Sequence, residues 1–493
     1  MAKQQDNQEN SLFAKVVSHA KEYGFVFQSS DIYDGLQAVY DYGPWGAELK
    51  KNLKDIWWTA MTRLNANVVG LDSAIFMHPT TWKASGHVDS FNDPMIDNKD
   101  SKKRYRADVL LEDKAARLEK EGDQAAADAL LKKAAALLEA EDMEGVRELI
   151  ISEGIVCPES GTDNWTEVRQ FNLMFSTQIG SVADDSSTIY LRPETAQGIF
   201  VNFLNVQKTS RQKVPFGIAQ IGKAFRNEIV ARQFIFRMRE FEQMEMQYFV
   251  RPNTEMEAYE QWREMRMKWH QAVGIPAEKL RYHKHEKLAH YANAAEDIEF
   301  EFPFGWKEVE GIHSRTDFDL KAHQEFSKKK MQYFDPEVNQ NYIPYVVETS
   351  VGADRLFLMH LCNAYTEEQV DQGDKVKERL YLKLHPAIAP VKAAIFPLVK
   401  KDGLPEKGME IFNQLRTRFK VIYEENQAIG KRYTRQDLIG TPFCIAVDHE
   451  TLENDTVTIR HRDTMEQERV PIAELEQRLA EATSPELIYS QLV

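Results

Sequence analysis

The clearest alternation of hydrophobic and polar residues lies in 215–250, PFGIAQIGKAFRNEIVARQFIFRMREFEQMEMQYFV, and it predicts two strands joined by a long loop. Side chains of equal parity share one face of a strand. One face of the first strand then carries Phe216, Ile218, Gln220, Gly222, Ala224, Arg226 and Glu228, and one face of the second carries Arg239, Phe241, Gln243, Glu245 and Gln247. We expect an antiparallel hairpin that gathers polar and aromatic side chains on these faces.

Segment 109–150 differs in pattern from the rest of the chain. It is rich in Ala, Leu, Glu and Lys at helical spacing, and Gly122-Asp123 interrupts it, which predicts a helical hairpin. We interpret about 109–160 as a helical insertion. A solvated arm with a narrow apolar stripe and a specific binding element are both compatible with this pattern.

A stretch rich in proline follows Leu384 and predicts a domain boundary, with a first domain over 1–385 and a second over 386–493. The second part carries alternating patterns: a helix over 407–426, an apolar run over 441–447, a polar turn over 449–455 and a strand over 456–460. Such alternation favours a small α/β domain with a mixed sheet.

The chain has 493 residues, with 62 Lys and Arg against 77 Asp and Glu, and the net charge of −15 argues against a purely electrostatic nucleic-acid binder. The N-terminal stretch lacks the order of a secretory signal, and no run of about 18 uncharged apolar residues occurs. We therefore expect a soluble, cytoplasmic protein without a membrane partner. The three cysteines, Cys157, Cys362 and Cys444, are too few for a disulfide framework.

Several common motifs are absent from the sequence. Residues 217–223 have the spacing of a phosphate loop, but Ala224 stands where a Ser or Thr holds magnesium, and the glycines sit in an alternating strand pattern. The strings GxGxxG, HExxH and GxSxG do not occur. Their absence removes the commonest dinucleotide-binding, metalloprotease and hydrolase interpretations.

Four arginines of the predicted hairpin suit a polyphosphate ligand. Arg226 and Arg239 lie on the strand faces, and Arg232 and Arg237 lie in the loop. Guanidinium groups bind phosphate through paired hydrogen bonds, and Phe241 is positioned to stack on a base. The alternative is a solvated ladder of cross-strand Arg and Glu pairs.

Residues 224–228 (AFRNE) and 237–241 (RMREF) resemble the second signature motif of the class II aminoacyl-tRNA synthetases. Residues 345–355 (YVVETSVGADR), followed by LFLMHL, resemble the third motif, a strand and a helix that carry one arginine. Residues 43–50 (GPWGAELK) resemble the first motif, a dimer-interface helix with a proline. The resemblance implies an α+β catalytic domain built on an antiparallel sheet, and a homodimer.

Within this class, the chain is most similar to the dimeric glycyl-tRNA synthetases. The strings that carry the similarity span nearly the whole first domain: 40–44 (YDYGP), 85–89 (SGHVD), 105–108 (YRAD), 169–175 (RQFNLMF), 191–198 (LRPETAQG) and 311–319 (GIHSRTDFD). The similarity implies an ATP-dependent ligase that activates glycine as glycyl-adenylate and transfers it to the 3′ end of tRNA-Gly.

The block from about 388 is similar to the C-terminal α/β anticodon-binding domain shared by glycyl, threonyl, prolyl and histidyl enzymes. Its cluster at 430–435 (GKRYTR) suits an RNA contact, with a solvated loop as the alternative. One departure from the family lies at 157–161 (CPESG), where many relatives carry the CPxCG element of a zinc ribbon. Because Ser160 replaces the second thiol, we expect a metal-free insertion without structural zinc.

The resemblance assigns ATP as a substrate and arginines as its phosphate ligands. Arg226 would hold the α-phosphate, Arg237 and Arg355 the γ-phosphate, while Glu228 would contact adenine and Phe241 would stack on it. These side chains organise charge, and the sequence supplies no evident general base. Further ATP-binding candidates are Asn227, Phe236, Met238, Arg239, Glu240, Glu308, Val309, Gly352, Ala353 and Asp354. Mg²⁺ is the expected cofactor, with Glu308 and Glu348 as the residues to hold it.

The resemblance places the glycine ammonium against Glu194, Glu245 and Glu348, with Ser350 beside them. Parity puts Glu245 on the Phe241 face, whereas Glu242 falls on the opposite side. Arg106 and Arg315 are candidates for the substrate carboxylate or a closing loop. The other substrate-binding candidates are Phe241, Glu242, Gln243, Met244, Thr349, Val351 and Gly352. Clustered carboxylates repel one another, so perturbed pKa values are expected in the empty pocket. Ordinary surface Glu is the alternative for each carboxylate.

Two other functions remain open from the sequence. One is a synthetase-like RNA-binding protein that has kept the fold and lost the chemistry. The other is a sibling class II enzyme for another small amino acid, such as threonine or proline. A threonine enzyme would normally need zinc ligands in its pocket, and we find none in the sequence.

Overall fold

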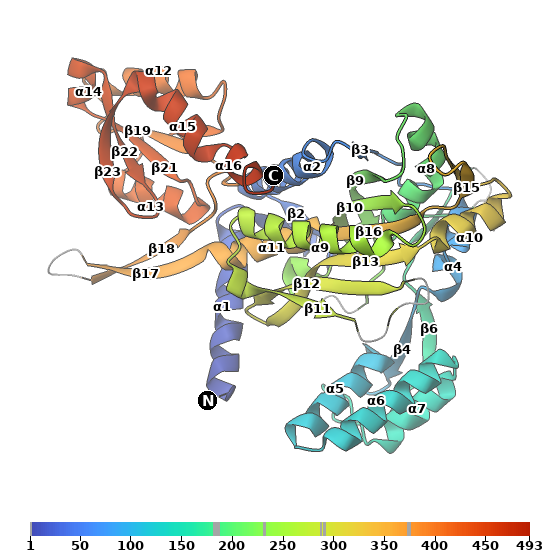
Figure 1. Cartoon of the computed structure of the whole chain (residues 1–493). Helices are drawn as coiled ribbons and strands as arrows, with labels where there is room; N and C mark the ends of the chain where they lie inside the picture. The colour runs from blue at the N-terminus through green and yellow to red at the C-terminus, as the bar shows by residue number, and fades with distance from the viewer. Residues whose placement is uncertain (1, 181–187, 230–232, 286–287, 289–291, 372–375) are drawn as a thin grey trace.

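A broad sheet, here called the main sheet, organises the first part of the chain (Figure 1). The structure is a computed structural model that describes residues 2–180, 188–229, 233–285, 288, 292–371 and 376–493. In spatial order the strands are β11 (Leu280–Lys284), β12 (Ala294–Phe302), β13 (Gly305–Thr316), β16 (Tyr345–Gly352), β10 (Glu240–Val250), β9 (Phe216–Phe225) and β3 (Val68–Gly70). Neighbouring strands pair antiparallel, except that β3 is parallel to β9. Arg232 lies outside the described residues.

The back face of the main sheet is covered by α2 (Pro44–Thr62), α9 (Glu255–Ala272) and α11 (Ala353–Ala364), while α1 (Ala2–Glu22) lies against α11. The apolar side chains that this layer buries include Met244, Met246, Val347, Val351, Trp262, Trp269 and Leu356. Burial of this size supplies the main driving force for the domain. Among the described helices, none is both long and apolar enough to cross a membrane.

Helices cover only part of the front face of the main sheet. α8 (Ala196–Thr209) and α10 (Phe318–Ser327) pack over Phe216, Ile218 and Phe249. These residues lie at the start of β9 and the end of β10, so the opposite ends of the two strands stay open. Polar side chains of the same parity occupy that open end.

The predicted hairpin and signature motifs are confirmed at the level of secondary structure. β9 and β10 pair antiparallel, and 217–223 is extended strand throughout, which rules out a phosphate loop. The third motif is β16 followed directly by α11. In the first motif, Pro44 occupies the first turn of α2, where its missing N–H and fixed φ are favourable.

Smaller elements flank the main sheet. The two-stranded pairs are β1 (Val26–Gln28) with β2 (Tyr40–Tyr42), β7 (Ser176–Gln178) with β8 (Thr188–Tyr190), β14 (Tyr333–Asp335) with β15 (Gln340–Tyr342), and β17 (Tyr365–Asp371) with β18 (Val376–Leu382). The short helices are α3 (Pro79–Ala84), α4 (His87–Ser90) and the 3-10 turns Asp31–Tyr33, Phe234–Phe236 and Ala277–Lys279, and a further 3-10 turn, Ile472–Glu474, lies in the C-terminal part. The β17–β18 hairpin projects away from the main sheet (Figure 1).

A helical group lies apart from the main sheet (Figure 1), on a small sheet of β5 (Lys103–Arg106), β4 (Asn92–Asn98) and β6 (Arg169–Asn172). It consists of α5 (Ala107–Lys120), α6 (Gln124–Glu139) and α7 (Met143–Ser152). Gly122 and Asp123 separate α5 from α6, and α7 adds a third helix to the predicted hairpin. Leu111, Ala127 and Ile150 belong to a core of this group's own. The apolar stripe is therefore buried within the group.

The C-terminal part is an α/β domain with a mixed sheet, as predicted. In spatial order its strands are β20 (Val421–Tyr423), β19 (Ala393–Pro397), β21 (Phe443–Val447), β22 (Thr456–His461) and β23 (Gln467–Pro471). β19 is parallel to β20 and β21, and the other pairs are antiparallel. The helices are α12 (Leu404–Leu415), α13 (Ile429–Ile439), α14 (His449–Asn454), α15 (Leu475–Thr483) and α16 (Glu486–Tyr489).

Two predictions for this part are wrong. The helix predicted over 407–426 ends at Leu415, because Val421–Tyr423 is a β-branched and aromatic run that joins the sheet beside β19. The turn predicted over 449–455 is the helix α14. A capping box formed by Asp448 and Thr451 nucleates it, since each side chain bonds the other residue's backbone N–H.

The basic and aromatic cluster 430–435 lies in α13. Arg432 is buried, and its Nη1 donates to the carbonyls of Pro397 at 2.8 Å and Glu424 at 3.0 Å. The ring of Tyr433 packs edge-on against Phe396, with 5.5 Å between centroids. Arg432 therefore supports the fold of this domain, whereas Lys431 is exposed to solvent.

Candidate active site

The candidate active site lies at the open end of β9 and β10, on the front face of the main sheet. Gln243 is opposite Gly222 across the hairpin, and Glu245 is opposite Gln220 on one side and Ser350 of β16 on the other. A cavity of about 170 Å³ opens here, which we call the front-face cavity. Its walls are Arg226, Glu228, Ile235, Phe236, Arg237, Met238, Phe241, Gln243, Glu308, Ser350, Gly352, Asp354 and Arg355.

Three arginines converge on the front-face cavity. Arg226 follows β9, Arg237 precedes β10, and Arg355 lies in the first turn of α11. Nε of Arg226 donates to the carbonyl of Pro193 at 3.0 Å, and its guanidinium lies 5.3 Å from the centre of the Phe241 ring. Burial lowers the pKa of Arg226, and the positive charge of Arg355 acts in the same direction. A bound anion would stabilise a buried cation of this kind.

Two glutamates complete the cavity wall. Arg355 Nη1 pairs with Glu308 Oε2 at 2.9 Å, and Arg237 Nη1 lies 3.9 Å from Glu228 Oε2. Against the effect of burial, Arg355 lowers the pKa of Glu308. The walls of the cavity therefore carry both signs of charge, with the arginines partly neutralised by carboxylates.

A β-bulge turns Glu308 toward the cavity. β13 and β12 change register between Ile298 and Glu299, so Glu308 and Glu310 face opposite sides of the sheet although they are two residues apart. Glu310 is fully buried behind the sheet, where Arg266 lies 2.6 Å from it. Without the bulge, Glu308 would point into the hydrophobic layer.

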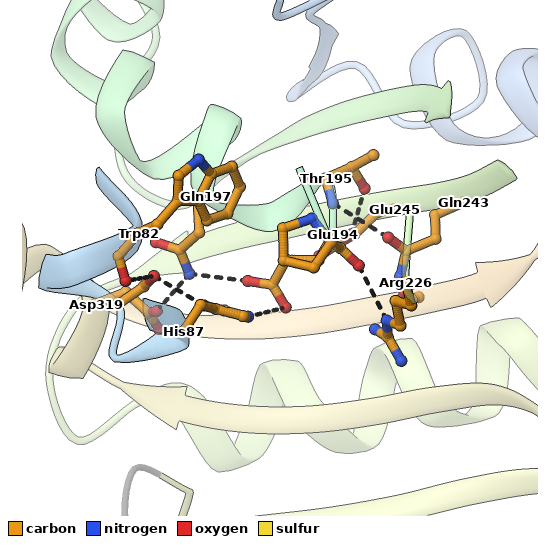
Figure 2. A network of polar contacts seen from close by, with 12 residues as sticks. Trp82, His87, Glu194, Thr195, Gln197, Arg226, Gln243, Glu245 and Asp319 are labelled. Atoms are coloured by element: carbon orange, nitrogen blue, oxygen red, sulfur yellow. Dashed lines mark hydrogen bonds and ion pairs between the residues drawn. The ribbon is translucent and has the colours of Figure 1, made fainter. Parts of the chain in front are cut away.

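Three carboxylates form a largely buried cluster next to the front-face cavity, here called the acidic pocket: Glu194, from the loop before α8, Glu245 of β10 and Glu348 of β16. Figure 2 shows Glu194 and Glu245 with their neighbours. Nε2 of Gln247 donates to Glu245 at 2.7 Å and to Glu348 at 2.6 Å, and the Thr195 hydroxyl donates to Glu245. The pocket is thus held in shape by neutral donors from its own strands and loop.

The acidic pocket has perturbed pKa values, as predicted for clustered carboxylates, but burial and repulsion between them raise the pKa of Glu245 alone, while cations lower those of the other two. Burial and the neighbouring charges of Glu348 and Glu194 raise the pKa of Glu245 well above its usual value. Against the effect of burial, His87 and Arg315 lower the pKa of Glu194 to about 2. Arg315 and His313 likewise hold the pKa of Glu348 below its usual range. One carboxyl of the three therefore tends to stay protonated in the empty pocket.

Cations line the far side of the acidic pocket. Arg315 Nη1 lies 3.2 Å from Glu348 Oε2, and His313 Nδ1 lies 2.8 Å from Glu348 Oε1. Arg315 Nε also pairs with Asp319 at 2.9 Å. In Figure 2, Gln197 bridges Glu194 and Asp319, with both donor–acceptor distances at 3.0 Å. Arg315 therefore links Glu348 of the pocket to Asp319.

Several predicted site residues lie off the cavity wall. Glu242 faces α2, where Lys50 lies 3.2 Å and Lys54 2.8 Å from its carboxylate, in agreement with its parity. Glu240 pairs with Lys223 on the surface at 2.5 Å. Arg239 Nε donates to the carbonyl of Glu228 at 3.0 Å. The others are outside the cavity lining: Met244, Val309, Val351 and Ala353 are buried in the hydrophobic core, Thr349 is buried in β16, and the backbone N–H of Asn227 donates to the Leu173 carbonyl.

Arg106 lies at the edge of the site. It pairs with Asp93 at 3.2 Å and with Asp108 at 2.5 Å. It lines a neighbouring cavity of about 240 Å³, which shares Phe236 and Arg237 with the front-face cavity. The carboxylate partners show that this side chain is already engaged in the absence of a ligand.

Sequence reasoning missed several residues that build the acidic pocket. Gln247 shares parity with Glu245, so its position was predictable although its bridging role was not. Thr195, Gln197, His313 and Asp319 all lie in the strings 191–198 and 311–319 that carry the family resemblance. Their contacts depend on loops whose path a strand or helix pattern does not determine.

The carboxylates of the site differ in how well they suit Mg²⁺. Within the described part of the chain, no group of three or more His, Cys, Asp or Glu could hold a metal ion. Mg²⁺ usually takes only one or two carboxylates and completes its shell with water and phosphate oxygens. Glu308 on the cavity wall fits that requirement. Glu348 is already paired with Arg315 and His313.

The element that departs from the zinc-ribbon pattern is held by hydrogen bonds. Cys157 Sγ lies 3.2 Å from the Tyr105 hydroxyl and 3.3 Å from the Ser101 hydroxyl. Ser160 Oγ donates to Asn98 Oδ1 at 3.0 Å. These hydrogen bonds tie the segments 98–101 and 157–160 together, and against the effect of burial those to Sγ lower the pKa of the Cys157 thiol to about 6.

Three known families match segments that together cover most of the chain. Residues 176–364 match the family described as tRNA synthetase class II core domain (G, H, P, S and T), and residues 392–482 match Anticodon binding domain. Residues 93–129 and 123–173 match Glycyl-tRNA synthetase insertion domain 1. The fold and the site therefore define a class II aminoacyl-tRNA synthetase with a C-terminal anticodon-binding domain.

Curated relatives define the family more narrowly. The chain is 57% identical to the glycine–tRNA ligase of Chlorobaculum tepidum, over 94% of this chain and 99% of the relative. It is 53% identical to that of Staphylococcus haemolyticus and 52% identical to that of Macrococcus caseolyticus, over 94% of this chain and 98% and 97% of the relatives. The chain belongs to the glycine–tRNA ligase family, and it joins glycine to tRNA-Gly with ATP as a substrate.

Proposed function

We propose that ATP binds in the front-face cavity, that glycine binds in the acidic pocket, and that glycyl-adenylate forms where the two meet. The observation that carries this proposal is the convergence of Arg226, Arg237 and Arg355 on one cavity whose Gln243 and Ser350 border the acidic pocket. The glycine carboxylate attacks the α-phosphorus and pyrophosphate leaves. Such a step needs positioning and charge neutralisation more than a protein nucleophile.

In this proposal each side chain of the front-face cavity has one role. Arg226 binds the α-phosphate, and Arg237 and Arg355 bind the γ-phosphate. Glu228 contacts adenine, and Phe241 stacks on the base. The proximity of Arg226 to the Phe241 ring supports a bound nucleotide that places its base and α-phosphate side by side.

The glycine ammonium binds to Glu194, Glu245 and Glu348, with Ser350 beside them. The buried carboxylates support this role because a cation would relieve their mutual repulsion. Larger amino acids are excluded by lack of room, since a pocket gains little from a side chain that is only hydrogen. Arg315 orients the carboxylates, and Arg106 contacts the incoming substrate or a closing loop.

Glu308 would hold Mg²⁺, with Glu348 as the second candidate. The ion would supply charge neutralisation at the phosphates. Glu308 is supported by its position on the cavity wall beside Arg355.

The second step transfers glycine to tRNA. The terminal ribose hydroxyl attacks the carbonyl carbon of the adenylate, the C–O bond to phosphate breaks, and AMP leaves. The phosphate of the departing AMP accepts the hydroxyl proton, so no protein general base is assigned.

The enzyme works as a homodimer, with a catalytic domain over 1–385, a helical insertion at about 109–160 and the anticodon-binding domain over 386–493. Dimerisation is supported by Phe27, Ile32, Tyr33 and Leu36, large apolar side chains that are exposed just before α2. Clusters of this kind mark interaction surfaces. A cytoplasmic location is supported by the tRNA substrate.

ATP–pyrophosphate exchange with each amino acid tests the site assignment. We expect exchange with glycine and none with alanine or serine, because alanine brings one extra non-hydrogen atom and serine two into the acidic pocket. Equal exchange with alanine would contradict the pocket, and no exchange with any amino acid would favour the silent RNA-binding alternative.

A further inference from the structure

The segment that joins the catalytic part to the anticodon-binding domain is residues 383–392, here called the interdomain linker. It lies between β18 and β19 and contains no helix or strand. Its backbone carbonyls therefore lack the partners that a sheet or helix would supply, and buried carbonyls need other donors. Arg462 donates to the carbonyl of Leu384, and the backbone N–H groups of Ile388 and Ala389 donate to that of His385. Two further side chains, one inside the linker and one on α2, bond the carbonyls between 386 and 389.

Lys392 bonds the linker to itself. Its Nζ donates to the carbonyls of Pro386 at 3.0 Å, Ala387 at 2.7 Å and Ala389 at 3.0 Å. The three donors of an ammonium group are thus all used on neutral acceptors. Burial lowers the pKa of Lys392 to about 7. A lysine placed in this way folds the linker into one compact turn.

Asn52 bonds the same turn to the catalytic part. Its Nδ2 donates to the carbonyls of Ile388 and Ala389, each at 3.1 Å. Ala389 therefore accepts from both side chains. Asn52 lies on α2, whose end is close to α16 and the C-terminus in Figure 1.

The two faces of α2 contact different parts of the protein. Lys50 and Lys54 bond Asp354 and Glu242 beside the front-face cavity. Asn52 and its neighbours one and two turns away line the opposite side, as expected for positions spaced by three or four residues. α2 is thus a shared support for the site of glycine activation and for the anticodon-binding domain.

Few direct contacts join α2 to the anticodon-binding domain. A cavity of about 920 Å³ separates them, lined by Glu48, Asp55 and Arg63 of the α2 side and by Arg418 and Lys420 of the other. Glu48 pairs with Lys420 across it at 3.1 Å. Elsewhere the domain is held by packing and ion pairs, since Ile488 is buried in the core of the catalytic part and Asp437 pairs with Arg379 at 3.0 Å. On the side of the cavity packing is sparse, so polar contacts hold the domain there.

We propose that Lys392 and Asn52 form a carbonyl clamp that fixes the anticodon-binding domain against α2, and that both are positioning residues for tRNA charging but not for glycine activation. The physical reason is that tRNA engages the catalytic part and the anticodon-binding domain at once. Binding at the second place is governed by an effective concentration, which falls when the connection loosens.

The experiment uses the full chain with Lys392→Met and Asn52→Leu, which remove the donors and keep similar side-chain size. Each variant is expected to raise the KM for tRNA in charging about tenfold, because a looser linker lowers the effective concentration. ATP–pyrophosphate exchange without tRNA is expected to stay within twofold of wild type. Hydrogen exchange of the linker amides should become faster in both variants.

Two controls distinguish the clamp from a general effect of losing a lysine and from a direct contact with tRNA. Lys383→Met removes an exposed lysine of the same linker and is expected to leave the KM for tRNA unchanged. A direct contact of Lys392 with phosphate would lower the slope of log(kcat/KM) against log salt by about 0.7–0.9, whereas a clamp residue leaves the slope unchanged. Asn52→Leu carries no charge change and tests the clamp independently.

Three results would overturn the proposal: a wild-type KM for tRNA in both variants, an equal loss of pyrophosphate exchange and charging, or a reduced salt slope in Lys392→Met alone. Because exchange reports on the front-face cavity by itself, failure of the clamp and failure of the site assignment are distinguishable.

Discussion

Arg315 and Glu348 form a buried ion pair at the base of the acidic pocket, with 3.2 Å between Nη1 and Oε2. The same guanidinium pairs with Asp319 through Nε at 2.9 Å. Its position on β13 places a permanent positive charge between two carboxylates of different elements. The acidic pocket therefore depends on a cation that pairs directly with Glu348, one of the carboxylates proposed to bind the ammonium.

Replacing Arg315 with Met should damage both the pocket and the fold. Loss of one partner leaves Glu348 and Asp319 buried with less neutralisation, and breaking buried pairs costs about 3–5 kcal/mol. We expect the KM for glycine in pyrophosphate exchange to rise at least about tenfold, together with a lower midpoint of thermal unfolding. The control is Lys321→Met, which removes the exposed partner of Asp317 at the start of α10. This variant should change neither the KM for glycine nor the midpoint of unfolding. A wild-type midpoint in Arg315→Met would refute the structural role.

Removing either arginine proposed to bind phosphate should abolish activation and preserve the fold. Arg226→Ala and Arg355→Ala each delete a charge aimed at the transferring phosphate, and losing one such donor typically costs about 10²–10³ in rate. Pyrophosphate exchange measures the loss, and circular dichroism checks the fold. Arg104→Ala, which breaks an exposed pair with Asp97, is the matched control. If both variants retained activity, the phosphate assignment would be wrong.

Glycine binding should release a proton from Glu245. The pKa of this carboxyl is raised above its ordinary 4.5 in the empty pocket, so it stays protonated over a window that begins near that value. A bound ammonium favours the ionised form, and therefore the affinity for glycine rises with pH through the window. A raised pKa also means that the ligand-free fold loses stability as pH rises past 4.5.

Calorimetry in two buffers of different ionisation enthalpy measures this proton release. Wild type should release a fraction of a proton per glycine, and Glu245→Gln should release less. Glu301→Gln, an exposed carboxylate on β12, should behave as wild type. Equal proton release by wild type and Glu245→Gln would assign the titration to another group.

Residue parity predicted the polar faces of the site, because Phe241, Gln243, Glu245 and Gln247 follow the strict two-residue period of β10. The same rule fails at Glu308, since the bulge in β13 adds a residue that no sequence pattern marks. The sequence pattern did not predict the loop that carries Glu194 and Thr195. Only the family resemblance indicated this segment.

In the anticodon-binding domain, the sequence pattern also did not predict that a charged side chain is buried. Arg432 belongs to a basic cluster that suits RNA, yet its guanidinium bonds carbonyls inside the fold. A charged residue in a polar segment gives no sign of such a role, because one of its acceptors, the Pro397 carbonyl, lies 35 residues away in sequence.

Lys50 should matter far more to stability than its neighbour Lys51. Lys50 is buried and pairs with Asp354 at 2.6 Å and Glu242 at 3.2 Å, whereas Lys51 is exposed and pairs with Asp55. Lys50→Met leaves two buried carboxylates short of a cation, at a cost of about 3–5 kcal/mol. Denaturant unfolding should show that loss, with Lys51→Met close to wild type.

The stability that Lys50 contributes to the fold should also depend on pH. Lys50 and Lys54 lower the pKa of Glu242 against the effect of burial, so the pair stabilises the fold above the ordinary carboxyl value. This part of the stability is lost as pH falls through the lowered pKa. A difference between wild type and Lys50→Met that stayed constant down to strongly acidic pH would contradict the ion-pair origin of the stability.

The exposed apolar residues before α2 should lie in the interface of the proposed homodimer. Ile32 and Tyr33 are 87% and 79% exposed in the single chain, which leaves large apolar side chains in water unless a second copy covers them. Ile32→Glu combined with Tyr33→Glu should shift the protein from dimer to monomer in sedimentation velocity. Val376→Glu changes an apolar residue that is 65% exposed on β18 and should remain dimeric. An unchanged dimer in the double variant would place the interface elsewhere on the chain.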